Sequence, residues 1–90
     1  MKLKKETKRF GRRIEKALNK AAALIKNGEG GEALCVLDKA RKETEAFAAE
    51  LKAIDKKKRR AAEYIEGAVV APAAAVVNGM MAEAVLAHDP

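Results

Sequence analysis

Hydrophobic side chains recur every three or four positions over the first third of the chain. The stripe consists of Leu3, Thr7, Phe10, Ile14, Ala17, Leu18, Ala21, Leu24 and Ile25. This spacing places them on one face of a helix and leaves the other faces to Lys and Arg. The three glycines that follow favour a turn, because glycine adopts positive φ without strain. The pattern predicts a helix over residues 2–27 and a Gly-rich turn over residues 28–31.

A second heptad pattern starts after the glycines and predicts a longer helix over residues 31–66. Its seam positions are Ala33, Leu37, Ala40, Thr44, Phe47, Leu51, Ile54, Lys58, Ala61, Ile65 and Ala68. Lys58 lies in a basic run, so we expect the seam to lose its partner there. If the chain folds back at the glycines, the two stripes meet in an antiparallel helical hairpin with coiled-coil packing. The pairs expected in contact are Leu24 with residues 34–37, Ile14 with Thr44, Thr7 with Leu51 and Leu3 with Ile54.

The last segment is apolar on most faces, and Ala, Val and Met dominate it. Gly67 and Pro72 predict a bend, followed by a helix over residues 73–87 that the Asn78-Gly79 pair would kink. A helix of this kind needs cover all round. The apolar interface is predicted at Val69, Val70, Val76, Val77, Met80, Met81, Val85 and Leu86.

Three environments remain open for this apolar segment. It would pack on the hairpin as a third helix, be buried between copies of the chain, or enter a membrane. Its uncharged stretch, residues 67–82, is shorter than the roughly 20 residues that a membrane span needs. The upstream basic run and Tyr64 nevertheless match the flank of a span.

The composition supports one all-α domain over residues 1–90, either a small three-helix bundle or a helical oligomer. Ala, Lys, Glu, Leu and Arg together make up most of the chain, and all favour helices. Hydrophobic residues make up 49% of the chain, but many of them are Ala and no Trp is present. Such a core is thin, so self-association would be a natural source of further buried area.

Charge is distributed unevenly along the chain. Residues 1–60 hold all 19 bases and nine of the 13 acids, whereas residues 61–90 hold no base and four acids. The hairpin would bring two basic segments together at its open end. The predicted partner-binding bases are Lys4, Lys5, Lys8, Arg9, Arg12, Arg13, Lys56, Lys57, Lys58, Arg59 and Arg60.

A cationic concentration of this kind attracts phosphates, anionic lipid or an acidic protein. The first basic segment has no Asn or Gln to read base edges, and its one aromatic residue, Phe10, falls in the apolar stripe. We therefore expect an acidic protein surface or a nucleoprotein complex as partner. Non-specific nucleic-acid binding and membrane association are the alternatives.

The sequence offers no constellation for catalysis. It contains no Ser, no metal-spaced set of His and Cys residues and no phosphate-binding loop. Cys35 cannot form an intrachain disulfide, which fits a cytoplasmic location, and is predicted on the side of its helix opposite the seam. His88 lies close to the chain end. We expect no catalytic, cofactor or metal site, and a non-enzymatic accessory protein that acts as an adaptor, inhibitor or assembly component.

Overall fold

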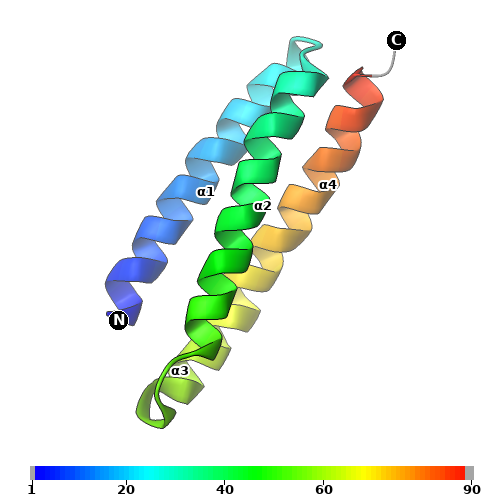
Figure 1. Ribbon diagram of the computed structural model, residues 1–90. Coiled ribbons are helices and arrows are strands. Elements are labelled where there is room, and N and C mark those ends of the chain that lie inside the picture. The colour runs from blue at the N-terminus through cyan, green and yellow to red at the C-terminus, as the bar shows by residue number, and fades with distance from the viewer. Residues whose placement is uncertain (1, 89–90) are drawn as a thin grey trace.

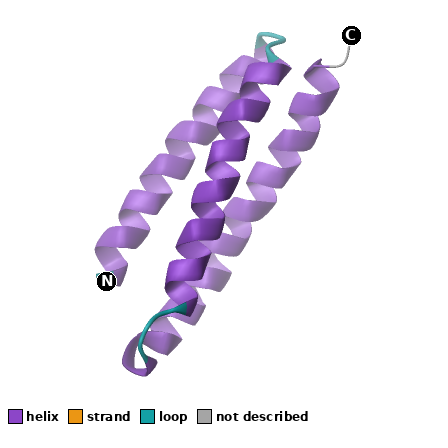
Figure 2. Ribbon diagram, viewed as in Figure 1, coloured by secondary structure: helices purple, strands orange, loops and turns teal. Residues whose placement is uncertain are grey.

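The computed structural model describes residues 2–88, which form a small bundle of three long helices (Figures 1 and 2). The elements are α1 (Leu3–Lys26), α2 (Gly30–Lys52), a 3-10 turn η1 (Lys56–Lys58), α3 (Arg59–Ile65), a π-helical turn η2 (Glu66–Val70) and α4 (Ala71–His88). The elements η1 to α4 follow one another without a break and make up the third long helix. The molecule measures 51 × 18 × 16 Å. The predicted all-α fold is confirmed.

The α1–α2 hairpin forms where the glycines predicted it. Among the described residues, positive φ occurs at Gly28, at 77°. The backbone N–H of Glu29 donates to the carbonyl of Leu24 across the turn at 2.8 Å, so the end of α1 is capped by the chain that reverses there. Phe10 and Phe47 stack with ring centroids 4.6 Å apart, which agrees with the register expected from the two heptads.

The two seam threonines behave differently. The Thr44 hydroxyl donates to the carbonyl of Ala40 at 2.8 Å, as expected of a buried threonine in a helix. The Thr7 hydroxyl is also buried, yet it has no hydrogen-bond partner in the described part of the chain. The two threonines occupy the same heptad position and both hydroxyls are buried. Within the described residues, however, the Thr44 hydroxyl is hydrogen-bonded and the Thr7 hydroxyl is not.

The prediction of a second helix over residues 31–66 is wrong, because α2 ends at Lys52. The chain reverses over residues 53–55, where Ile54 packs against the core and Asp55 precedes the next helix at a position that Asp favours. The Arg59 guanidinium donates to the carbonyls of Lys52 at 2.9 Å and Ile54 at 3.1 Å, which caps α2. The reversal lays the apolar C-terminal segment on α2, whereas a continuous helix would leave that segment uncovered.

The predicted seam beyond this reversal is correspondingly lost. Lys58, Ala61 and Ala68 are exposed, and Ile65 is half-buried. The third helix buries residues other than the predicted seam positions, because it does not continue α2 and packs against the hairpin as a separate helix.

The predicted bend at residues 67–72 is also absent, since the third helix continues through η2 and α4 starts at Ala71, two residues before the predicted helix over residues 73–87. The Ala71 N–H donates to the carbonyl of Glu66, five residues back. This wider turn lies where the ring of Pro72 would otherwise meet the carbonyl four residues before it. The π-helical turn therefore accommodates Pro72, and the helix continues without a break.

The π turn also keeps the inward face of the third helix in register. Its fully or almost fully buried residues are Ala62, Val70, Val77 and Ala84, spaced by eight, seven and seven positions. The extra residue between Ala62 and Val70 is the one that the π turn inserts. The core has two parts. One surrounds Phe10, Phe47 and Leu51, and the other joins Ala84 to the helices at the Gly-rich turn.

Candidate docking surfaces

The two basic segments lie at the same end of the bundle. Figure 1 shows the N-terminus of α1 and the α2–α3 connection together, far from the Gly-rich turn. A groove of about 500 Å³ at this end is lined by Lys4 and Lys8 of α1 and by Ala61 and Tyr64 of α3, among others. The groove shows that the basic part of α1 lies next to the helix that begins with the second basic run. We call this surface the cationic end, and it comprises residues 2–13 and 56–60.

The cationic end presents most of its bases to solvent. Every predicted partner-binding base except Arg59 is exposed: Lys4, Lys5, Lys8, Arg9, Arg12, Arg13, Lys56, Lys57, Lys58 and Arg60. Arg59 is half-buried and holds the end of α2, so its part is structural. Residues 2–13 carry seven bases and one acid, and residues 56–60 carry five bases and no acid. That acid, Glu6, lies 3.5 Å from Arg9.

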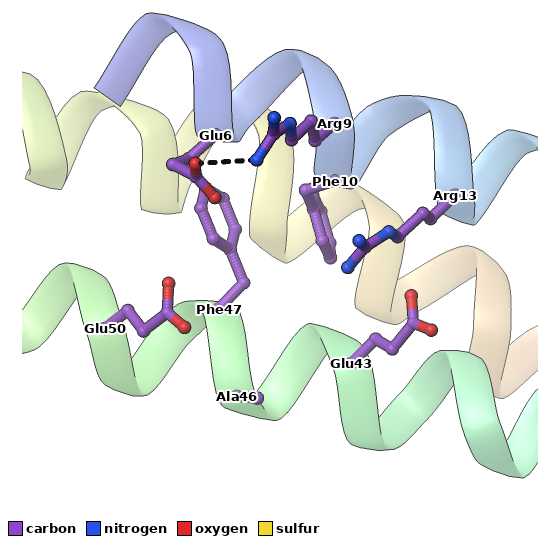
Figure 3. A pocket seen from close by; sticks show the side chains of 8 residues that line it. All are labelled: Glu6, Arg9, Phe10, Arg13, Glu43, Ala46, Phe47 and Glu50. Carbon is purple, nitrogen blue, oxygen red and sulfur yellow. Dashed lines mark hydrogen bonds and ion pairs between the residues drawn. The ribbon is translucent and has the colours of Figure 1, made fainter. Parts of the chain in front are cut away.

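A groove between α1 and α2 continues from the cationic end along the hairpin. Its first part, about 120 Å³, is shown in Figure 3, where Arg9 and Arg13 of α1 lie opposite Glu43 and Glu50 of α2. The stacked phenylalanines form its floor. Because both signs of charge line this part, its electrostatic field is largely balanced.

The second part of the groove is more basic. It measures about 340 Å³ and shares Arg13 and Glu43 with the first part. Its further charged side chains are Lys16, Lys20 and Lys39, around a floor that includes Ala17, Val36 and Ala40. The sequence did not single out Lys20 or Lys39, because they lie on different helices and only the hairpin brings them together.

A separate set of charges on α2 is mutually neutralised. Arg41 donates to Asp38 at 2.7 Å and to Glu45 at 2.8 Å, and Lys42 lies 3.2 Å from Asp38. The hydrogen bond from Arg41, followed by that from Lys42, holds the pKa of the Asp38 carboxyl below its ordinary value. Arg41 and Glu45 lie partly exposed beside α4, and the pairing of all four groups leaves them little attraction for a charged partner.

The predicted apolar interface divides between the two sides of the third helix. Val70 and Val77 are buried against the hairpin, and Val69, Met80 and Met81 are half-buried. Val76, Val85 and Leu86 point outwards and are 47, 54 and 77% exposed. Small residues complete this outer side, with Ala68, Ala71, Pro72, Ala75, Gly79 and Ala82 all exposed. We call these nine exposed residues the outer face; the uncharged Asn78 also lies exposed among them.

The third helix is long and apolar enough over Lys56–Ala87 to cross a membrane, by length and composition alone. Only 17% of an apolar 18-residue stretch of this helix is buried in the bundle. Core helices of water-soluble proteins satisfy the same criteria, so this property by itself is weak support for a membrane span. It does show how much apolar surface the bundle leaves open.

The remaining candidate residues lie apart from these surfaces. Cys35 is exposed on α2. The side chain of His88 lies outside the described residues. Over the part of the chain that the structure describes, no three His, Cys, Asp or Glu residues gather where they could hold a metal ion.

Comparison of the chain with protein-family models, with curated proteins and with solved structures gave no match in any of the three.

Proposed function

We propose that this protein is a non-catalytic interaction protein that docks its cationic end on an acidic surface of a larger protein or nucleoprotein assembly. The observation that carries the proposal is the convergence of two basic segments about 50 residues apart in sequence at one end of a bundle only 18 × 16 Å across. A concentration of like charge costs folding free energy through self-repulsion. A partner of opposite charge would offset that cost.

An acidic protein surface fits this end better than base-specific recognition of nucleic acid. The exposed side chains of residues 2–13 are Lys and Arg, with no Asn or Gln, while Phe10 is buried in the hairpin. Tyr64 is the exposed aromatic next to the groove at this end, and a single ring gives no succession of stacking platforms. The cationic end therefore offers charge and shape, which are the means by which protein surfaces steer one another into contact.

Charge reversal at the cationic end tests the proposal. The test variant carries Lys5→Glu, Arg12→Glu and Lys57→Glu, and the control variant carries Lys20→Glu, Lys26→Glu and Lys39→Glu outside that end. Each variant, and the unmodified chain, is used to capture proteins from nuclease-treated extract of the source cells at low and at high salt. We expect the unmodified chain and the control to retain the same acidic protein at low salt. The test variant should lose it.

Three outcomes would contradict the proposal. Capture of material from untreated extract but not from nuclease-treated extract, with direct binding to duplex DNA or RNA, would favour the nucleic-acid alternative, whose affinity falls steeply with salt. Retention of anionic vesicles without any protein would favour the membrane alternative. Equal capture by the test and control variants would show that the cationic end is not the docking surface.

A further inference from the structure

We propose that the outer face of the third helix binds a second copy of this chain, with the two α4 helices antiparallel. The proposal concerns a surface different from the cationic end, so it does not depend on the identity of the acidic partner.

The outer face is an extended apolar surface that the bundle leaves uncovered. No charged side chain occurs between residues 67 and 82, and Val76, Val85 and Leu86 are about half or more exposed. A helix that is apolar all round is stable in water only when all its sides are covered. The hairpin covers the side with Val77 and Ala84 and leaves the opposite side to solvent.

The order of residues on this face suits pairing with itself. A two-fold axis places residue i of one copy opposite residue j of the other and residue j opposite residue i. With the axis at Asn78-Gly79, Ala71 meets Leu86 of the second copy and Ala75 meets Ala82 of the second copy. The large side chain thus lies opposite a small one, and the centre is formed by small residues that allow close approach of the two helices.

Gly79 supports the same arrangement from the single bundle. A methyl group added at Gly79 would meet no atom within 4 Å, so the bundle itself does not require glycine there. Glycine inside a helix costs about 1 kcal/mol relative to alanine. Gly11 and Gly67 are equally open in the bundle, and Gly79 is distinguished from them by its place at the centre of the outer face, where a second helix would approach.

The charge distribution selects the antiparallel orientation. A parallel pair would place the two cationic ends side by side, where they would repel each other. The opposite end of the bundle carries Lys26 against Glu29, Glu32 and Glu83. An antiparallel pair about Asn78-Gly79 places the two cationic ends at opposite extremities of the dimer, where their repulsion is screened.

A second copy also fits better than a lipid bilayer. The exposed Asn78 lies among the residues of the outer face, which is next to the exposed Glu83, and no base follows Arg60, so its C-terminal border lacks the cations that anchor helices to anionic headgroups. A complete span would in addition pull Val77 and Ala84 out of the core, where they are 1 and 0% exposed. A second copy covers the outer face and leaves the bundle intact.

The size of the face predicts a weak dimer. Residues 71–86 extend over roughly 24 Å of helix at 1.5 Å per residue. A strip of that length and about 10 Å wide buries on the order of 250 Å² per copy, below the roughly 800 Å² per partner of a standard stable interface. We therefore expect a dimer that dissociates on dilution.

Sedimentation equilibrium of the purified chain tests the association, from about 10 µM to about 1 mM, the range expected for a small, transient interface. The test variant is Ala75→Glu/Ala82→Glu, and the matched control is Ala22→Glu/Ala49→Glu, which places the same change at exposed alanines of α1 and α2. The unmodified chain and the control should approach twice the 9.7 kDa monomer mass at the highest concentrations. The test variant should stay at the monomer mass while keeping its helical circular dichroism.

Disulfide trapping tests the orientation. In a Cys35→Ala background, one chain carries Ala71→Cys and another carries Leu86→Cys. The antiparallel pair predicts that an equimolar mixture cross-links mainly between the two different chains. Cross-linking of Ala71→Cys chains mainly with each other would overturn the orientation.

The remaining outcomes would overturn the proposal that the outer face binds a second copy. A monomer at every concentration, or equal association of the test and control variants, would overturn the second-copy proposal and leave the proposed function of the cationic end untouched. Insertion of the unmodified chain into neutral phosphatidylcholine vesicles, abolished by Ala75→Glu/Ala82→Glu, would assign the outer face to a membrane instead.

Discussion

The α1–α2 hairpin and the third helix are stabilised by opposite kinds of sequence. In α1, apolar residues form a single stripe with Lys and Arg on the other faces, so the sequence itself states which side is buried: Phe10, Ile14 and Ala21. In α4, nearly every face is apolar, and over its described side chains, residues 71–87, Val77 and Ala84 are the ones that become fully buried. The comparison teaches that an amphipathic helix specifies its own orientation, whereas a uniformly apolar helix takes its orientation from its neighbours.

The same difference separates the two surfaces available to partners. The hairpin supplies most of the bases of the cationic end, and the third helix supplies the outer face with no base after Arg60. Charge acts over a Debye length of about 8 Å at physiological salt, while apolar contact needs close packing. The protein therefore carries one surface suited to attracting a partner and another suited to packing on one.

The largest expected effect comes from introducing a charged side chain on the inner side of the third helix and comparing it with the same change on the outer side. Val77→Asp places a carboxylate in the core, where Val77 is 1% exposed, and should cost about 4 kcal/mol or more of unfolding free energy. Val76→Asp, one residue away and 47% exposed, should change the free energy by about 0.5 kcal/mol or less in dilute solution. Urea unfolding measures both. Equal losses would mean that the third helix has no fixed inward side.

A smaller effect is expected where the two regions join. Arg59→Ala removes the two hydrogen bonds to the carbonyls of Lys52 and Ile54 and should cost about 1 kcal/mol. The adjacent Arg60 is exposed, so Arg60→Ala serves as the control and should change the unfolding free energy by about 0.5 kcal/mol or less. If thermal and urea unfolding find the two variants equally stable, the end of α2 does not depend on the Arg59 cap.

The smallest effect concerns the ion pairs on α2. The pKa of Asp38 is lowered in the folded chain by Arg41 and Lys42, so its contribution to stability is present above the unfolded pKa and is lost as the pH falls through the folded pKa. Asp38→Asn should therefore melt slightly below the unmodified chain at pH 7, and the two should converge below the ordinary Asp pKa of about 4. A difference that persists at low pH would assign the effect to something other than the charge.

Much of the fold could be predicted from the sequence for physical reasons that act locally. The heptads fixed the buried faces of α1 and of α2 as far as Leu51, and the glycines fixed the first reversal. The second reversal escaped prediction because residues 53–55 contain neither Gly nor Pro. Its causes are the packing of Ile54 on the core and the hydrogen bonds of Arg59 to carbonyls five and seven residues back, and these contacts form only once the chain has reversed.

The candidate surfaces show the same division. The sequence by itself determined that bases are confined to residues 1–60, that the last third is apolar, and that the two basic segments would meet if the chain reversed. Only the tertiary structure decided that Arg59 is a cap, that Lys20 and Lys39 share a groove, and that Val77 faces inwards while Val76 faces out. Charge and helix propensity belong to single residues, but the covered side of a uniformly apolar helix is set by the helices that pack against it.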